Sequence, residues 1–406
     1  MAIGESVWQD PAQILGLKIG VAAAGVKYEN RNDLAVLLLD EGTRVSGVFT
    51  QNAFSAAPVQ ICKDHLKSGS IRALLINSGN ANACTGEAGM QAALDTCEVL
   101  GQELSVSSNA VLPFSTGVIG EVLPAEKISS AIPTACAAAH ENNWKGFAEA
   151  IMTTDTRPKV ASKTYKVEEG SISVSGVSKG AGMINPNMAT MLAYVATDAR
   201  VSQSLLDELS RKAANLSFNR ITIDGDTSTN DSAILIATGK CGSSEITSLN
   251  DERYKILEAA VIDVYQSLAK QIVEDGEGAT KFVTVEVHGG QTANESLKVA
   301  YAVAHSPLVK TALFASDPNW GRIVAAVGYA DVSELEAEKI RVWLDDVLIV
   351  ENGGRAASYT EDAGQAVFDK SHFTIKIDLG RGVESQSLWT TDLSHEYIRI
   401  NAEYRS

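Results

Sequence analysis

Short apolar runs alternate with longer amphipathic segments along the whole chain. The short runs are rich in Val, Ile, Leu and Thr and end at Gly, Asn or Asp, which is typical of β-strands. They predict strands over residues 34–40, 45–50, 71–79, 220–226, 232–239, 281–290, 340–354 and 373–380. A strand should also begin near Thr190, because an apolar run follows this residue.

The longer segments have the apolar spacing of helices. They cover residues 87–105, 202–217 and 252–275. In the last of these, apolar residues from Ile256 to Leu268 recur every three or four positions, and Gly276 should end the helix. The pattern therefore predicts an α/β or α+β protein with several layers.

A chain of 406 residues has room for two or three domains. The composition changes at residues 288–294, and we place a domain boundary there. Residues 1–288 would form the core, and residues 289–406 would form a C-terminal α/β domain.

The overall charge of the chain excludes one class of partner. The net charge is −16, so the chain should repel the phosphates of nucleic acids. No apolar segment is long enough to cross a bilayer, and the N-terminus lacks the pattern of a secretion signal. Five dispersed cysteines are typical of reduced, buried thiols. We therefore expect a cytoplasmic protein that binds neither nucleic acid nor membrane.

No motif predicts a metal or a nucleotide cofactor. The six histidines are scattered, and the Gly-rich stretches do not match the nucleotide-binding patterns. Asp224, Asp226 and Asp231 lie close together in "DGDTSTND" but lack the order of a calcium loop. We interpret this stretch as a hydrogen-bonded turn near the functional site.

The segment "KGAGMINPNMATML" presents a threonine hydroxyl at the end of a Gly- and Pro-containing loop. A hydroxyl needs a neighbouring base to become a nucleophile, and the α-amino group of Thr190, with a pKa near ~8, could serve. That base exists only if the Ala189–Thr190 bond is cut. The hydroxyl could make this cut by attacking the preceding carbonyl to form an ester that water then opens. From the loop alone, a threonine that merely starts a strand is the alternative.

Further motifs occur in a fixed order along the chain. They are "LLINSGNANACTG" from Leu74, "PFSTGVIGE" from Pro113, "AIMTTDTRPK" from Ala150, "FNRITIDGDTSTNDS" from Phe218, "DGEGATK" from Asp275, "DPNWGR" from Asp317 and "YIRINAEYRS" from Tyr397. Together with the segment around Thr190, they resemble the ornithine acetyltransferase family, the bifunctional glutamate N-acetyltransferases of arginine biosynthesis. The resemblance covers essentially the whole chain.

The resemblance implies a role for each residue that matches the family's motifs. Thr190 would be both the residue released by cleavage after Ala189 and the nucleophile that carries the acetyl group. Thr116 and Gly117 would form the oxyanion hole. The matching substrate contacts are Thr153, Lys179, Thr190, Glu277, Asn401 and Ser406.

Two of these assignments keep an alternative open, and a third motif has no assigned role. We choose Thr153 as the substrate threonine, and the adjacent Thr154 is the alternative. The family often ends in threonine where this chain has Ser406. The stretch from Asp317 to Arg322 could be interpreted either as loop structure or as an internal ion pair.

The resemblance also implies the fold and the reaction. The fold would be a four-layer αββα sandwich with a smaller C-terminal α/β domain, processed into an α chain of residues 1–189 and a β chain of residues 190–406. Two of each would assemble. The enzyme would move an acetyl group from N2-acetylornithine to glutamate, giving ornithine and N-acetylglutamate, with no bound cofactor. Whether acetyl-CoA is a second donor stays open.

Two other functions fit the same features. A self-processing aminopeptidase or amidase of related fold would use the same nucleophile with water as acceptor. A binding protein that keeps the fold would remain unprocessed.

The first prediction concerns the cut itself. The wild-type chain should give two bands near half of its 43.0 kDa mass on a denaturing gel. Thr190→Ala should give one full-length chain and no acetyl transfer, because it removes the attacking hydroxyl. Cleavage that persists in Thr190→Ala would contradict the role of this residue.

Overall fold

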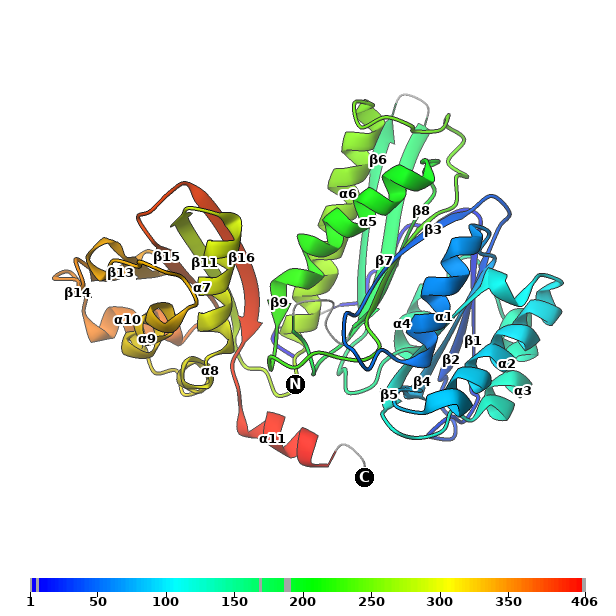
Figure 1. Cartoon of the computed structure of the whole chain (residues 1–406), viewed down its shortest axis with the longest axis horizontal. Coiled ribbons are helices and arrows are strands. Elements are labelled where there is room, and N and C mark those ends of the chain that lie inside the picture. Colours follow the sequence, from blue (N-terminus) through cyan, green and yellow to red (C-terminus); the bar gives the residue numbers. More distant parts are fainter. Residues whose placement is uncertain (1, 5–6, 168–169, 186–190, 404–406) are drawn as a thin grey trace.

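The chain folds around three β-sheets (Figure 1), and the computed structural model describes residues 2–4, 7–167, 170–185 and 191–403. Ala189, Thr190 and Ser406 lie outside the described residues. The mixed α/β class predicted from the sequence is confirmed.

The first sheet has the strand order β1-β2-β4-β5. These strands are β1 (Leu17–Ala22), β2 (Leu34–Leu39), β4 (Ala73–Asn80) and β5 (Val111–Val118). Only β4 and β5 run parallel; the other neighbours are antiparallel. Helices α2 (Gly86–Leu104) and α3 (Ala125–Ala137) pack on its outer face, and α1 (Ala57–His65) lies against β5.

The second sheet has the order β3-β10-β8-β7-β6. Its strands are β3 (Arg44–Phe49), β10 (Ser232–Ala237), β8 (Leu192–Thr197), β7 (Gly170–Lys179) and β6 (Lys159–Val167). Helices α5 (Gln203–Asn215) and α6 (Glu252–Glu274) cover its outer face. The strand expected after Thr190 is β8, and it pairs antiparallel with β7.

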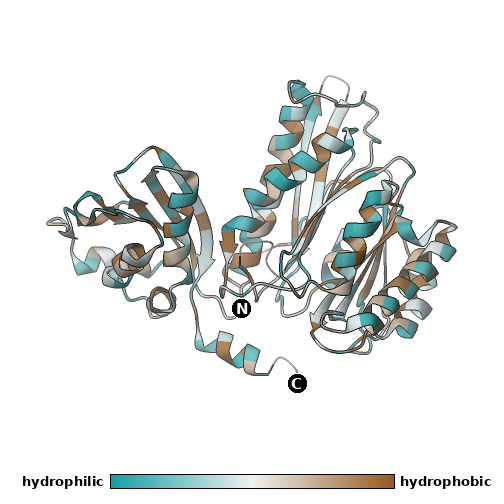
Figure 2. Ribbon diagram, in the orientation of Figure 1, coloured by the Kyte–Doolittle hydropathy of each residue, from teal (hydrophilic) through white to brown (hydrophobic). Residues whose placement is uncertain are grey.

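The inner faces of these two sheets pack against each other. Leu37 and Ile76 of the first sheet belong to the same buried cluster as Tyr194 and Ile234 of the second. Helix α4 (Trp144–Ala150) fits between them and inserts Phe147, whose ring centroid lies 5.1 Å from that of Tyr194. Figure 2 shows this arrangement as hydrophobic strands with more hydrophilic helices outside them.

The third sheet has the order β14-β13-β12-β15-β11-β16-β9. Its strands are β9 (Ile221–Thr222), β11 (Phe282–Gly290), β12 (Arg341–Leu344), β13 (Val347–Glu351), β14 (Gly354–Arg355), β15 (His372–Asp378) and β16 (Glu384–Thr391). The helices in this part are α7 (Ala293–His305), α8 (Pro307–Phe314), α9 (Trp320–Tyr329) and α10 (Glu361–Phe368). Residue 288, where we placed the end of the core, lies inside β11 of this sheet.

The last helix leaves the third sheet and reaches back toward the first two. Helix α11 (His395–Ala402) follows β16, and Figure 1 shows it set apart from the third sheet. Ser394 caps it by accepting a hydrogen bond from the backbone N–H of Tyr397. Four short 3₁₀ turns complete the elements of the described residues, at Leu66–Ser68, Ser108–Ala110, Phe218–Arg220 and Ala337–Lys339.

The apolar pattern found most strands and missed a few. The runs at 34–40, 45–50, 71–79, 232–239, 281–290 and 373–380 all contain strands, and the three predicted helices are α2, α5 and α6. The prediction of one strand over residues 340–354 was wrong, because a turn after Leu344 divides this segment into the antiparallel strands β12 and β13. The run at 220–226 forms only the two-residue β9, and no strand was predicted for β1, β5, β6, β7 and β16.

The cysteine prediction was also wrong at one position. Cys62 and Cys97 are buried and Cys136 and Cys241 are half-buried, but Cys84 is exposed. Within the described part of the chain, no helix is long and apolar enough to cross a membrane.

The "DPNWGR" motif builds the start of α9. The side-chain oxygen of Asn319 accepts a hydrogen bond from the backbone N–H of Arg322, which caps the helix. The guanidinium of Arg322 donates to the carbonyl oxygen of Leu308 at 2.8 Å, and Asp317 accepts instead from the Asn319 amide. The motif is therefore a loop that leads into and caps α9. Among the described residues, Asp317 and Arg322 form no ion pair with each other, so the ion-pair interpretation was wrong.

The core between the two sheets gives a stability prediction. Among the described residues the buried Tyr194 hydroxyl has no hydrogen-bond partner. An unpartnered buried hydroxyl costs about 1–3 kcal/mol, so Tyr194→Phe should keep or raise the free energy of unfolding. Tyr194→Ala, which leaves a cavity, should lower it by about 3–5 kcal/mol. Denaturant unfolding measures both; a loss above about 1 kcal/mol in Tyr194→Phe would show that the hydroxyl is bonded.

Candidate active site

Six of the residues expected at the site line one cavity. They are Thr116, Gly117, Thr153, Lys179, Glu277 and Asn401. The wall is completed by Ala81, Ile119, Thr154, Ala181, Gly182, Met183 and Ser228, Thr229, Asn230. The segments come from both of the first two sheets, from the loop after α6 and from α11, so the fold gathers residues that are far apart in the sequence.

Thr116 and Gly117 end β5 at the point where its pairing with β4 becomes irregular. Gly117 has φ +136°, and an added Cβ would lie 2.3 Å from the backbone carbonyl carbon of Gly79. Only glycine allows this close approach of the two strands. Asn230 donates to the carbonyl oxygens of Ala81 and Ser115 at 2.6 and 2.9 Å, which joins the β10 side of the cavity to β4 and β5.

Lys179 is the last residue of β7 and is almost fully buried. Burial lowers the pKa of its ammonium, while the charges of Asp155, Asp231 and Glu277 act in the opposite direction. Its ammonium lies 3.5 Å from the Thr153 hydroxyl. A buried cation that faces a cavity suits a substrate carboxylate.

A buried ion network fixes the backbone next to Lys179. The Lys159 ammonium lies 2.5 Å from Asp155 Oδ1 and 2.6 Å from Asp275 Oδ2, with all three side chains inaccessible to solvent. Asp155 also accepts the backbone N–H of Gly180 at 2.7 Å. Burial alone would raise the pKa of Asp155, but the charges of Lys159 and Lys179 and these hydrogen bonds lower it to about 2.

Glu277 and Asn401 meet on the opposite side of the cavity. The Asn401 amide donates to Glu277 Oε2 at 2.7 Å. Glu277 is 8% exposed, although glycines flank it on both sides directly after a helix, a local pattern that is typical of an exposed turn. Burial raises the pKa of its carboxyl, and hydrogen bonds from Thr154 and Asn401 partly offset this. A Cβ at Gly182 would lie 2.5 Å from the Glu277 carboxyl, so a larger residue there would displace this carboxyl.

Both threonines of the "MTTDT" motif line the cavity. The Thr153 hydroxyl lies beside the Lys179 ammonium, and the Thr154 side chain forms a hydrogen bond with the Glu277 carboxyl. The structure therefore gives each a place beside a different charged group, and the choice between them stays open.

The aspartates of "DGDTSTND" anchor the backbone on both sides of the expected cleavage point. Asp224 accepts the backbone N–H groups of Met183 and Ile184 at 2.5 and 3.0 Å. Asp231 accepts the N–H of Met191, the residue after Thr190, at 3.0 Å. Within the described residues, no group of three or more His, Cys, Asp or Glu side chains is arranged to hold a metal ion. The prediction of a hydrogen-bonded turn near the site is confirmed.

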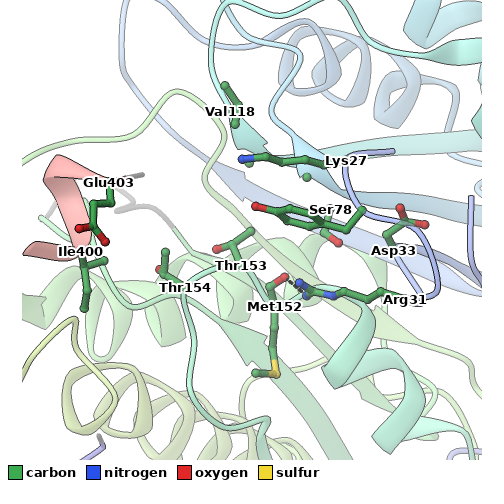
Figure 3. Close-up of a pocket in the computed structure, with 13 residues that line it drawn as sticks. Lys27, Arg31, Asp33, Ser78, Val118, Met152, Thr153, Thr154, Ile400 and Glu403 are labelled. Atoms are coloured by element: carbon green, nitrogen blue, oxygen red, sulfur yellow. Dashed lines mark hydrogen bonds between the residues drawn. The ribbon is translucent and has the colours of Figure 1, made fainter. Parts of the chain in front are cut away.

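A second cavity adjoins the first and was not predicted (Figure 3). It shares Gly117, Thr153 and Thr154 with the first, and its outer wall carries Lys27, Tyr28 and Arg31 from the loop between β1 and β2. Arg31 donates to the carbonyl oxygen of Met152. Ile400 and Glu403 of the C-terminal segment close the other side. No spacing pattern pointed to the loop residues, because the fold alone brings them to the site.

The ion network predicts a pH-dependent loss of stability. Asp155→Asn should lower the free energy of unfolding by about 3–5 kcal/mol at pH 7, because Lys159 loses one of two buried partners. The carboxyl has a folded pKa of about 2 against its usual 3.8, so its contribution is complete above about pH 4 and disappears as the pH falls toward 2.

Denaturant unfolding of wild type and variant across this pH range measures the difference. Asp331→Asn, at the exposed ion pair of Asp331 with Lys298, is the matched control and should change little. Equal losses in the two variants would contradict the importance of the network.

Comparison with known proteins identifies the family. The ArgJ family matches residues 18–406. Two relatives called arginine biosynthesis bifunctional protein ArgJ, from Pseudomonas syringae pv. tomato and Pseudomonas fluorescens, are 55% and 54% identical to this chain over 406 residues, with 100% of each chain covered.

Two solved structures are also similar to parts of the chain. The arginine biosynthesis bifunctional protein ArgJ of Bacillus halodurans is 34% identical, with a TM-score of 0.48 over 50% of this chain and 95% of that one. The ornithine acetyltransferase of Mycobacterium tuberculosis, complexed with ornithine, is 35% identical, with a TM-score of 0.41 over 43% and 92% of the two chains. The match of the family over residues 18–406 and the full-length identity above 50% show that this chain belongs to the ArgJ family.

Proposed function

We propose that the chain cleaves itself before Thr190 and then transfers an acetyl group from N2-acetylornithine to glutamate through an acetyl-Thr190 intermediate. Membership of the ArgJ family makes it an acetyltransferase of arginine biosynthesis. One observation supports the residue roles most directly: Thr116, Gly117, Thr153, Lys179, Glu277 and Asn401 line the same cavity.

The cleavage needs only groups of this chain and water. The Thr190 hydroxyl would attack the carbonyl carbon of Ala189, and the Ala189–Thr190 peptide bond would break as an ester forms. Water would open the ester, leaving a carboxylate on Ala189 and a free amine and hydroxyl on Thr190. Cleavage would leave an α chain of residues 1–189 and a β chain of residues 190–406.

The acetyl transfer would use Thr190 and the oxyanion hole in each of its two half-reactions. The neutral amine of Thr190 would take the hydroxyl proton while Oγ attacks the acetyl carbonyl, and Thr116 with Gly117 would stabilise the oxyanion. The proton would then pass to the nitrogen of the leaving ornithine. In the second half-reaction the amine of glutamate would attack the acetyl-enzyme and release N-acetylglutamate. No step requires a bound cofactor.

The charged residues of the cavity are suited to amino-acid substrates. Lys179 would pair with a carboxylate of the substrate, and Glu277 would accept hydrogen bonds from an ammonium. Thr153 or Thr154, Asn401 and Ser406 would complete the binding site. Holding the acceptor amine close to the acetyl group would favour glutamate over water.

The finer structural expectations are part of the same proposal. We interpret the first two sheets with their outer helices as the four-layer αββα sandwich, and the third sheet with its helices as the C-terminal α/β domain. Two α and two β chains would assemble in the cytoplasm. The word "bifunctional" in the names of the Pseudomonas relatives makes acetyl-CoA the second donor to test.

Initial-rate kinetics test the proposed transfer. Because the donor's product leaves before the acceptor reacts, double-reciprocal plots for acetylornithine at several glutamate concentrations should be parallel. Intersecting lines would contradict a covalent intermediate. Acetate released from acetylornithine at equal rates with and without glutamate would instead support the self-processing hydrolase.

A further inference from the structure

Asp231 lies directly before β10, with its carboxyl group beside the start of β8. It is 1% exposed, and its backbone carbonyl oxygen accepts the N–H of Thr50. Its Oδ1 accepts the backbone N–H of Met191 at 3.0 Å. The Ser232 N–H donates to the Met191 carbonyl oxygen at 3.1 Å, where β10 begins to pair with β8. The backbone of Met191 is thus bonded through both its N–H and its carbonyl group. Met191 is therefore held rigidly against Asp231.

The second oxygen of this carboxyl is buried without a partner. Among the described residues, Oδ2 of Asp231 accepts no hydrogen bond. Burial raises the pKa of the carboxyl well above its usual value, against the smaller effects of the Met191 N–H, the Lys179 charge and the nearby Ser228 hydroxyl, which does not reach hydrogen-bond geometry with Oδ2. A buried carboxyl oxygen without a hydrogen bond lowers the stability of the folded state. Its presence in a native structure therefore needs an explanation.

The covalent chain limits which group can reach that oxygen. Thr190 lies outside the described residues, but its carbonyl carbon is bonded to the Met191 nitrogen. Standard bond lengths keep the nitrogen atoms of two consecutive residues within about 3.7 Å of each other. The Thr190 nitrogen is therefore no more than about 3.7 Å from the backbone nitrogen that the Asp231 carboxyl already holds.

We propose that Asp231 is the counter-ion of the α-ammonium group that cleavage creates at Thr190, and that it positions this amine to act as the base of the transfer. The inference rests on the cleavage and transfer proposed above. Before cleavage the Thr190 nitrogen is a neutral amide. Cleavage converts it into an amine that gains a proton in each half-reaction, and Oδ2 then receives its charge-assisted hydrogen bond.

The surrounding charges determine whether the pKa of the Thr190 amine rises or falls. Asp231 would raise the pKa of the Thr190 amine, whereas the ammonium of Lys179 at the end of β7 would lower it. Lys179 is itself faced by Asp155, by Lys159 of β6 and by Glu277 of the loop after α6. These charges remain in place when Asp231 alone is changed.

The test is Asp231→Asn in the full-length chain. The Asn carbonyl can still accept the Met191 N–H, so cleavage should proceed. Loss of the negative charge should lower the pKa of the Thr190 amine, so the acidic limb of the kcat/KM profile for acetylornithine should move down by about one pH unit. With the amine no longer positioned, kcat should fall about tenfold or more while KM changes less than about threefold.

Asp198→Asn provides the matched control at the other end of β8. Asp198 is also a buried carboxyl that accepts a backbone N–H, from Ser173 at 2.9 Å, but it does not line the cavity. This variant should keep kcat within about twofold and leave the pH profile unchanged. An unchanged acidic limb in Asp231→Asn, a shift equal to that of Asp198→Asn, or a chain that stays uncleaved would overturn the proposal.

A structure of the cleaved wild-type protein tests the contact even if the variant does not fold. The distance between the Thr190 nitrogen and an Asp231 carboxyl oxygen should be about 2.7–3.1 Å, and a distance beyond about 4 Å would overturn the proposal. N-terminal sequencing separates the two levels of inference. A wild-type protein without a new N-terminus at Thr190 contradicts the proposed function, whereas a cleaved, active protein without the contact contradicts only the role of Asp231.

Discussion

The buried ammonium of Lys159 is the constraint on which the geometry of the site depends. It must be satisfied by charge, because a lone buried cation costs several kcal/mol, and it is satisfied by Asp155 and Asp275. Asp155 in turn fixes the backbone after Lys179, and Asp275 ends α6 two residues before Glu277. One internal cation therefore positions both charged walls of the cavity, which come from different elements.

The apolar pattern predicted many strands whose buried side chains are large, and it missed strands built mostly from small polar ones, such as β7. It also missed β1 and β5, although their buried side chains are large. Strand β7, "GSISVSGVSK", is buried along most of its length, yet six of its ten residues are Ser or Gly. Its hydroxyls pair with those of β6: Ser162 with Ser175 at 2.9 Å and Thr164 with Ser173 at 3.2 Å. Since hydroxyls of β6 satisfy Ser173 and Ser175, β7 can be buried without the hydrophobicity that a sequence pattern detects.

The sequence could supply the motif residues of the site but not the groups that hold them. Gly117 and Glu277 were found because their motifs resemble a family, and the local pattern around Glu277 indicated an exposed turn. The partners Asp155, Lys159 and Asp231 lie inside quoted motifs, but the motifs did not show which groups these residues would contact. Their roles follow from contacts between distant segments, such as that of Lys159 with Asp275, which only the fold creates.

The loop that follows β9 explains how a cut at the site can leave the site intact. Its first aspartate, Asp224, holds Met183 and Ile184, and its last, Asp231, holds Met191, so both flanks of the cleavage point are anchored to one loop. Beyond these anchors, β7 and β8 pair along six residues within the second sheet. Because neither the anchors nor the ladder use the bond between Ala189 and Thr190, its loss would free the amine while Ile184 and Met191 stay held by the two aspartates.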